Sequence, residues 1–274
     1  MALSRAVPVF VIRVSSFLRI SLFVIRHFPR PSSIRQGFCA TARAPRLNMI
    51  PARQIQAVTF DVGGTLIHPW PSVGHVYAEV AAQHGLKNLS PEKLNKNFAA
   101  AWRAKKNFQH TRESWADIVD QTFAGRCAPP PSRSFFPAIY QRFAEADAWR
   151  IYDDALPALE ALASRDIPLA VISNWDERLR PLLQQFQLDR YFETIVVSCE
   201  VGFAKPSPVI FEHAVKKLGL VPDRILHIGD SAEEDVAGAK AAGVRALLVD
   251  RDNTTGDAAR IGSLRDLEVF LYPP

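Results

Sequence analysis

The feature that most constrains the fold is an alternation of short apolar runs with amphipathic helical patterns. Five such runs occupy residues 55–62, 167–173, 194–199, 224–230 and 245–250. Their length and their lack of polar alternation are typical of parallel strands that are buried on both faces. Helical patterns follow at residues 154–164, 207–218 and 232–242. This alternation predicts an α/β fold, in which right-handed crossovers join the strands of an open parallel sheet.

About one hundred residues without a strand signal separate the first two runs. Ser90-Pro91 and Thr111 are typical helix starts, Gly85 is a typical stop, and a further helix is expected between Phe135 and Ala146. A helical insert just after the carboxyl end of a strand would overhang that end of the sheet and exclude water from it. We therefore predict a core formed by residues 55–67 and 152–274, with a helical cap formed by residues 68–151.

Residues 1–48 form a basic extension that we exclude from the core. Residues 1–60 hold nine arginines and neither lysine nor acid, which leaves 24 basic against 28 acidic residues in the rest of the chain. The basic charge of the whole chain is therefore no sign of a nucleic-acid partner. The arginines also interrupt the apolar stretches, so no membrane span is expected. The extension indicates either a mis-assigned start before Met49, and hence a cytoplasmic protein, or a transit peptide for a mitochondrion or another organelle.

Polar residues stand at the carboxyl end of four of the expected strands. They are Asp61 with Thr65, Ser173 with Asn174, Lys205, and Asp230 with Asp235. Because parallel strands end at the same edge of a sheet, these side chains should lie close together, where ligands of open α/β sheets bind. Clustered carboxylates repel one another unless a cation lies among them, and oxygen ligands are those that Mg²⁺ prefers.

The expected site therefore combines a metal with an anion pocket. Asp61 and Asp230 are the natural direct ligands of Mg²⁺, with Asp235 as a ligand or a supporting group and the Gly63 carbonyl as a further oxygen. Lys205, Thr65 and Ser173 would hold an anionic group such as a phosphoryl group. Asp61 could then attack phosphorus and form an aspartyl phosphate, while the metal and Lys205 offset the charge of the transferring group.

Four segments carry a resemblance to a known family. DVGGTL (61–66), VISN (171–174), AKPSP (204–208) and HIGDSAEEDVAGAKAAG (227–243) resemble, in order and spacing, the four motifs of the haloacid dehalogenase-like (HAD) hydrolases. The helical insert resembles the type 1 cap of one subfamily. The resemblance implies a Rossmann-like core and a Mg²⁺-dependent phosphatase that acts on a small phosphorylated metabolite. It also implies that Asp61 is the nucleophile, that Thr65 and Ser173-Asn174 bind substrate, that Lys205 stabilises charge, and that Asp230 and Asp235 serve the metal.

One position departs from the family pattern. Phosphatases of the family usually carry an aspartate two residues after the nucleophile, as an acid and base, where this chain has Gly63. A positioned acid or base contributes typically ~10²–10⁴-fold to the rate. The site could therefore favour good leaving groups, unless His68 or a cap residue replaces the missing carboxyl group.

Gly63 also leaves two other functional classes open. One is a carbon-centred hydrolase of the dehalogenase or phosphonoacetaldehyde hydrolase type, the latter with a cap lysine such as Lys105 or Lys106. The other is a phosphate-binding protein that has lost turnover. The remaining histidines, including His110, are expected at the surface or in packing contacts. Trp102 and Trp115 are expected to pack in the core or the cap, whereas Trp70 and Trp175 could line a pocket. The sequence indicates neither the substrate nor the oligomeric state.

Overall fold

The computed structural model describes residues 55–105, 108–251 and 260–271. The basic extension of residues 1–48 and the alternative start at Met49 lie outside the described residues, so the two hypotheses for the compartment stay predictions. No helix among the described residues is long and apolar enough to span a membrane.

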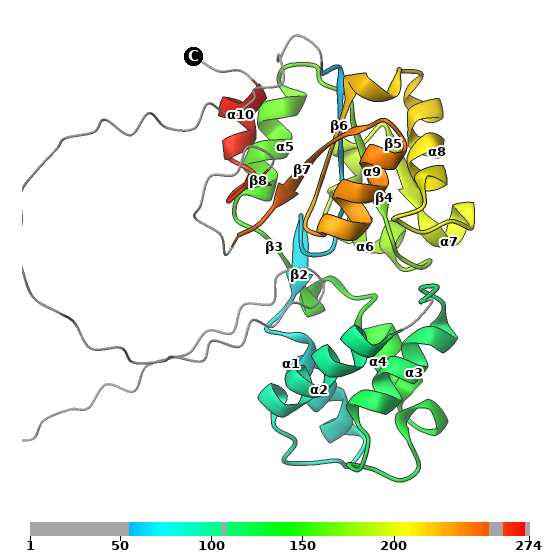
Figure 1. Cartoon of the computed structure of the whole chain (residues 1–274). Helices are drawn as coiled ribbons and strands as arrows, with labels where there is room; N and C mark the ends of the chain where they lie inside the picture. The colour runs from blue at the N-terminus through cyan, green and yellow to red at the C-terminus, as the bar shows by residue number, and fades with distance from the viewer. Residues whose placement is uncertain (1–54, 106–107, 252–259, 272–274) are drawn as a thin grey trace, which may run out of the picture.

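The core is a six-stranded parallel sheet with the strand order β5-β4-β1-β6-β7-β8 (Figure 1). The strands are β1 Ala57–Phe60, β4 Leu169–Ser173, β5 Thr194–Val197, β6 Ile225–Gly229, β7 Arg245–Val249 and β8 Arg260–Ile261. Each apolar run of the sequence contains one of the first five strands, and the predicted α/β class is confirmed. The two-residue strand β8 was not predicted, because two residues show no periodicity.

Helices cover both faces of this sheet. Those of the core are α5 Ala155–Ala163, α6 Leu179–Gln185, α7 Ser198–Val201, α8 Pro208–Leu218, α9 Gly238–Ala241 and α10 Asp266–Leu271. Short 3₁₀ turns occur at η2 Pro131–Arg133, η3 Ala146–Ala148, η4 Asp189–Tyr191 and η5 Pro222–Arg224. Leu159 and Leu182, from α5 and α6, pack with Phe60 in one buried cluster. Ile210 and Phe211 of α8 pack in another cluster, on the opposite face.

A second layer, which we call the cap, lies beyond one end of the core strands (Figure 1). Its helices are α1 Val73–Gln83, α2 Pro91–Ala104, α3 Arg112–Thr122 and α4 Phe136–Arg142. The side chains of Ser90 and Thr111 accept hydrogen bonds from the first turns of α2 and α3, which confirms both predicted helix starts. The cap has its own buried cluster, centred on aromatic residues such as Tyr77, Phe98 and Phe123.

A two-stranded antiparallel ribbon joins the cap to the core. Strand β2 Ile67–Pro69 pairs with β3 Trp149–Ile151, and the Tyr152 amide donates to the Leu66 carbonyl (3.0 Å). The expectation that no strand lies between the first two apolar runs is therefore wrong. Three-residue strands give no period-2 signal, and Pro69 weakens the pattern further. We propose that the boundary between cap and core lies at this ribbon, near residues 68 and 151.

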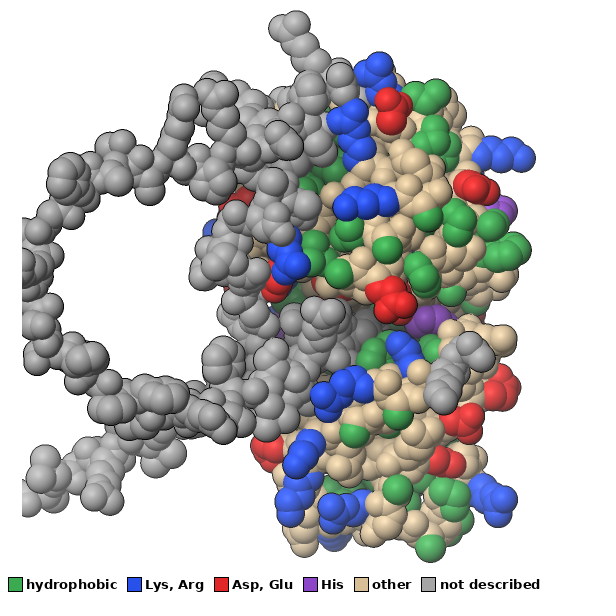
Figure 2. Space-filling view, viewed as in Figure 1, with side chains coloured by type: hydrophobic (Ala, Val, Ile, Leu, Met, Phe, Trp, Pro, Cys, Tyr) green, Lys and Arg blue, Asp and Glu red, His purple; other side chains and the backbone are tan. Residues whose placement is uncertain are grey.

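Charged side chains of both signs are interspersed over the core and the cap. On the face shown in Figure 2, both layers carry lysine or arginine side chains as well as aspartate or glutamate side chains.

Candidate active site

The Asp61 side chain lies at the carboxyl end of the central strand β1. Its amide donates to the Ile228 carbonyl of the neighbouring strand β6 (2.9 Å), and the residue is 7% exposed. The chain then turns sharply, because the amides of Leu66 and Ile67 both donate to the Val62 carbonyl (2.8 and 3.0 Å). Gly64 has a φ of 81° within this turn, a left-handed conformation that favours glycine. The turn therefore holds Asp61 at the carboxyl end of β1 with little freedom to move.

Two donors from other parts of the core converge on one carboxylate oxygen of Asp61: Ser173 ends β4, whereas Lys205 lies in the loop between α7 and α8. The Ser173 hydroxyl donates to Oδ1 (2.9 Å), and the Lys205 ammonium donates to the same atom (2.7 Å). The Lys205 ammonium also donates to Asp235 Oδ1 (2.6 Å) and is almost fully buried. Burial alone would lower the pKa of Lys205, but the charges of Asp235 and Asp61 raise it above its ordinary value. Lys205 is therefore a fixed cation beside the carboxylate of Asp61.

Asp235 is the most firmly held carboxylate of the site. The backbone amide of Ser231 donates to its Oδ2 (2.9 Å), and Nε2 of His227 lies 3.0 Å from its Oδ1. Nδ1 of His227 in turn lies 2.9 Å from the Thr59 hydroxyl. Burial acts to raise the pKa of Asp235, but Lys205 and His227 outweigh it and lower the pKa. His227 was missed from the sequence, because it stands inside the apolar strand β6, although it is the first residue of the fourth motif.

The segment after β6 is a π-helical turn, η6 Ala232–Ala237, followed by the short helix α9. The sequence predicted one regular helix over residues 232–242, and only its start at Ser231 is confirmed, where the Ser231 hydroxyl accepts from the Glu234 amide (3.1 Å). The wider turn places Asp235 against Gly229, where a Cβ atom would stand 2.1 Å from Asp235 Cγ. Single π turns are rare and are found mostly at functional sites.

Three carboxylates form a cluster that suits a divalent cation. Asp61, Asp230 and Asp235 each offer an oxygen, and these atoms lie within 4.8 Å of one another. Oδ2 of Asp230 is buried and has no hydrogen-bond partner among the described residues. Burial, together with the charges of Asp61 and Asp235, raises the pKa of Asp230 well above its ordinary value. Lys205 alone does not balance three carboxylates, so the residues present fit a bound Mg²⁺ ion.

Gly63, Asn174 and Thr65 are the remaining residues that the sequence predicted for the site. Gly63 and Asn174 line the same cavity as Asp61. The Asn174 side chain binds the backbone of Lys205 in both directions, accepting from its amide (2.6 Å) and donating to its carbonyl (2.9 Å). Asn174 therefore holds the loop that presents the lysine. Thr65 is fully buried and is not among the residues that line the cavity, and its hydroxyl lacks a partner among the described residues.

The cavity above Asp61 has a volume of about 80 Å³. Its floor is formed by core residues, among them Asp61, Ser173, Asp230 and Asp235, and its roof by the cap residues Trp102, His110 and Trp115. Trp102 and Trp115 pack against the buried cluster of the cap, as expected, and they also line this cavity together with His110. Their place in the cavity has no sequence signal, because the two tryptophans belong to ordinary helical stripes and His110 stands in the connection between α2 and α3.

A polar contact crosses from the cap to the core beside this cavity. The Lys105 ammonium lies 3.6 Å from the Trp102 ring centroid and 3.9 Å from Glu234 Oε1. Glu234 also lines the cavity, and its Oε2 accepts from the Asn174 side chain (3.2 Å). Burial raises the pKa of Glu234, whereas Lys205 and Lys105 act in the opposite direction. The fold therefore brings Lys105 and Glu234 together at the boundary between cap and core.

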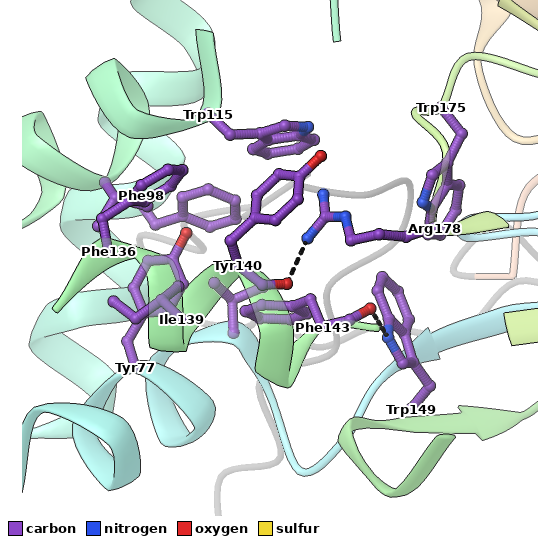
Figure 3. A pocket seen from close by; sticks show the side chains of 12 residues that line it. Tyr77, Phe98, Trp115, Phe136, Ile139, Tyr140, Phe143, Trp149, Trp175 and Arg178 are labelled. Carbon is purple, nitrogen blue, oxygen red and sulfur yellow. Dashed lines mark hydrogen bonds between the residues drawn. The ribbon is translucent and has the colours of Figure 1, made fainter. Parts of the chain in front are cut away.

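A second, apolar cavity of about 30 Å³ lies next to the first and shares Trp115 and Trp175 with it (Figure 3). One of its walls is Arg178 of the core, which donates to the Tyr140 carbonyl of the cap (2.9 Å) and lies 3.6 Å from the Tyr140 ring. The Tyr140 hydroxyl returns a hydrogen bond to Glu177 of the core (2.9 Å). These contacts close the cap over the site.

A parallel sheet that presents a buried aspartate, lysine and acidic cluster beneath a helical cap defines a hydrolase of the HAD-like class. The family model for haloacid dehalogenase-like hydrolases matches residues 55–243, and the chain belongs to that family.

Relatives and a solved structure agree with this assignment. The chain is 32% identical over 207 residues to the human haloacid dehalogenase-like hydrolase domain-containing protein 3, covering 72% of this chain and 82% of the relative. It is 31% identical over 205 residues to a phosphoglycolate phosphatase of Chromobacterium violaceum, covering 72% and 86%. The structure of a 2-haloacid dehalogenase from Pseudomonas syringae superposes with a TM-score of 0.57 and 25% identity, covering 79% of this chain and 98% of that one.

Proposed function

We propose that this protein is a Mg²⁺-dependent phosphatase that acts on a small phosphorylated metabolite through an aspartyl phosphate on Asp61. The observation that carries the proposal is the pairing of a fixed carboxylate with a cation site. Asp61 Oδ1 accepts from Ser173 and Lys205, and the oxygens of Asp230 and Asp235 lie within 4.8 Å of an Asp61 oxygen. The relationship to a phosphoglycolate phosphatase supports phosphoryl chemistry.

The first step is attack of the Asp61 carboxylate on phosphorus. A new bond forms between the carboxylate oxygen and phosphorus as the bond from phosphorus to the leaving group breaks, and the leaving group departs with the electron pair. Lys205 is 4% exposed, so its charge acts on the transferring group in a medium of low dielectric constant, where electrostatic stabilisation is strong. Ser173 holds the carboxylate in one orientation throughout this step.

Asp61, Asp230 and Asp235 would hold the metal ion, with the Gly63 carbonyl as a further candidate ligand. The ion would supply Lewis-acid charge beside the phosphoryl group and would offset the mutual repulsion of the three acids. Burial raises the pKa of Asp61, against the opposing effect of Lys205. The positive charge of Lys205, and that of a bound ion, would favour the ionised form of this carboxylate.

The second step is hydrolysis of the aspartyl phosphate. Water attacks phosphorus, the bond to Asp61 breaks, and the water proton leaves with the inorganic phosphate. No carboxyl group occupies position 63, so neither step has the usual acid and base. Leaving groups that are stable as anions, such as carboxylates, need no proton, so the missing acid at position 63 slows their departure least.

The size of the cavity limits the substrate. The cavity, of about 80 Å³, is bounded by the core residues around Asp61 and by Trp102 and Trp115 of the cap. A phosphoryl group with a short leaving group is therefore the expected occupant while the cap is closed.

We further propose that the protein binds neither nucleic acid nor a membrane and acts in the cytoplasm.

The decisive experiment is phosphate release from acetyl phosphate by residues 49–274, with and without Mg²⁺, beside Asp61→Asn. Acetyl phosphate is small and its acetate leaves as an anion, so the assay does not depend on a group at position 63. We expect release that requires both Mg²⁺ and Asp61, with p-nitrophenyl phosphate as a second, larger substrate. Equal release by the wild type and by Asp61→Asn would overturn the proposal.

Gly63 and the likeness to a 2-haloacid dehalogenase favour a second candidate, a carbon-centred hydrolase. A halide leaves without a proton, so Gly63 would be no loss to such an enzyme. The retained cluster of Asp61, Asp230 and Asp235 argues against this reading, because three carboxylates this close fit a metal ion, which displacement of a halide by Asp61 does not require. Chloride release from 2-chloropropionate that is independent of Mg²⁺ would establish this activity. Phosphate binding without either activity would indicate a protein that has lost turnover.

A further inference from the structure

His110 is a buried polar residue in the roof of the catalytic cavity. It follows α2 and precedes α3, with a φ of 57°, and it is 6% exposed. Its ring lines the cavity that holds Asp61. This placement differs from that of His84, the cap histidine whose Nδ1 lies 2.9 Å from the Val80 carbonyl.

The surroundings of His110 are aromatic and offer its ring little hydrogen bonding. Its ring centroid lies 4.8 Å from that of Phe108, 6.2 Å from that of Trp115 and 6.4 Å from that of Trp102. Nδ1 is buried and has no hydrogen-bond partner among the described residues. A buried polar atom without a partner is costly and rare in native proteins. Because His110 lines the cavity above Asp61, we expect a bound substrate to supply the missing partner of its ring.

We propose that His110 contacts the substrate, as a hydrogen-bonding partner for an uncharged hydroxyl or carbonyl oxygen on the leaving group of a small phosphate ester or acyl phosphate. The inference rests on the proposed phosphatase function and adds the class of leaving group. Asp61 and the metal site hold the phosphoryl group on the floor, so the leaving group is directed toward the roof, where His110 is found.

The carboxylates that line the cavity disfavour a substrate that carries a second anionic group. Glu234 and the three acids of the floor line the cavity, and the cap cation Lys105 is already engaged with Trp102 and Glu234. The imidazole itself is neutral, because burial and the charge of Lys105 lower the pKa of His110 to about 3. A neutral imidazole can donate or accept a hydrogen bond, which suits a hydroxyl or carbonyl group. The small volume restricts the leaving group to a few atoms.

Three two-carbon phosphate esters test this proposal, because they are similar in size and differ only at the far end. Ethyl phosphate ends in a methyl group, 2-hydroxyethyl phosphate in a hydroxyl group, and phosphoglycolate in a carboxylate. Each is measured as a competitive inhibitor of acetyl phosphate hydrolysis in the presence of Mg²⁺, so none needs to be turned over. We expect the wild type to bind 2-hydroxyethyl phosphate about 5- to 10-fold more tightly than ethyl phosphate, as one hydrogen bond provides, and more tightly than phosphoglycolate.

Variants then assign the preference to the imidazole. His110→Leu removes the polar group of the protein, so the ratio of the inhibition constants of ethyl and 2-hydroxyethyl phosphate should fall to about one. The protein variant and the ligand pair together form a double-mutant cycle, which isolates the contact between imidazole and hydroxyl. His110→Asn should keep part of the preference, and the matched control His84→Leu should keep all of it. Circular dichroism and the melting temperature check that each variant folds.

The outcomes separate the inference from the function on which it rests. A wild-type ratio near one, or a ratio unchanged in His110→Leu, overturns the role of His110. Tighter binding of phosphoglycolate than of 2-hydroxyethyl phosphate overturns the uncharged leaving group. If acetyl phosphate hydrolysis does not depend on Asp61, the proposed function fails, and the same three ligands are compared by calorimetry, where the ratio still decides for or against His110.

Discussion

The floor and the roof of the catalytic cavity are built on different principles. The floor consists of charged groups at strand ends, fixed by hydrogen bonds such as the pair that Lys205 gives to Asp61 and Asp235. The roof consists of Trp102 and Trp115 on cap helices and of His110 in the connection between α2 and α3, whose Nδ1 lacks a partner in the described part of the chain. The floor is therefore arranged before a substrate arrives, whereas the roof offers a group that the substrate must satisfy. Chemistry should depend on the floor, and the choice of substrate on the roof.

The largest effect that can test this division is the loss of Asp61, the proposed nucleophile. Asp61→Asn keeps the shape of the side chain but removes its charge, so phosphate release from acetyl phosphate should fall by at least ~10³-fold. His110→Asn in the roof should change kcat/KM for the same substrate by no more than ~10-fold. Steady-state phosphate release by both variants measures the contrast, and comparable losses would show that the division between floor and roof is wrong.

The second test adds to the floor the carboxyl group that it lacks. Gly63 is not among the glycines with a positive φ, so another residue can adopt its backbone conformation. Gly63→Asp should raise the turnover of alkyl phosphates such as ethyl phosphate by ~10²–10⁴-fold, because an acid can then protonate the leaving alkoxide. Turnover of acetyl phosphate should change little. Gly63→Asn is the matched control, since its amide has a similar size and transfers no proton; an equal gain in that variant would contradict the acid role.

How far the sequence predicted the site follows the same division. Asp61, Ser173 and Asp230 were found because a parallel sheet brings strand ends to one edge, so their position along the chain predicts their position in space. His227 was missed because its role arises from pairing with Asp235 and Thr59, which a strand pattern does not show.

The roof could not be predicted for a different reason. Trp102 and Trp115 belong to apolar helical stripes. Such a stripe predicts that a residue is buried, but not whether it faces the interior of the cap or the surface that covers the core. Which of these faces covers the core depends on the β2–β3 ribbon, whose strands are too short to show a period. The cavity lining is thus set by tertiary contacts such as that between Arg178 and Tyr140.

The third test separates metal binding from stability. A Cβ atom at position 229 would stand 2.1 Å from Asp235 Cγ, so Gly229→Ala should displace this carboxylate and weaken Mg²⁺ binding by roughly 10–100-fold, as changes around metal ligands do. The Mg²⁺ concentration for half-maximal phosphate release and the rise in melting temperature with Mg²⁺ both measure the effect. Gly238→Ala is the control, because its Cβ would meet Phe211 and Pro206 instead, at 2.8 and 2.9 Å. Equal loss of Mg²⁺ affinity in both variants would show that general strain is the cause.

The smallest effect concerns the stability of the roof in acid. Burial and Lys105 lower the pKa of His110 to about 3, while its unfolded value is about 6.5. Between these values the unfolded state binds a proton that the folded state does not, so stability falls as the pH decreases below 6.5 and the contribution is complete near pH 3. His110 should thus add up to about 1.4 kcal/mol of destabilisation for each pH unit. Urea unfolding from pH 7 to 4.5 should show a shallower decline for His110→Leu than for the wild type, and an unchanged one for His84→Leu. A decline that is equally steep in His110→Leu would mean that His110 is protonated in the folded protein, and the roof would then carry a charge.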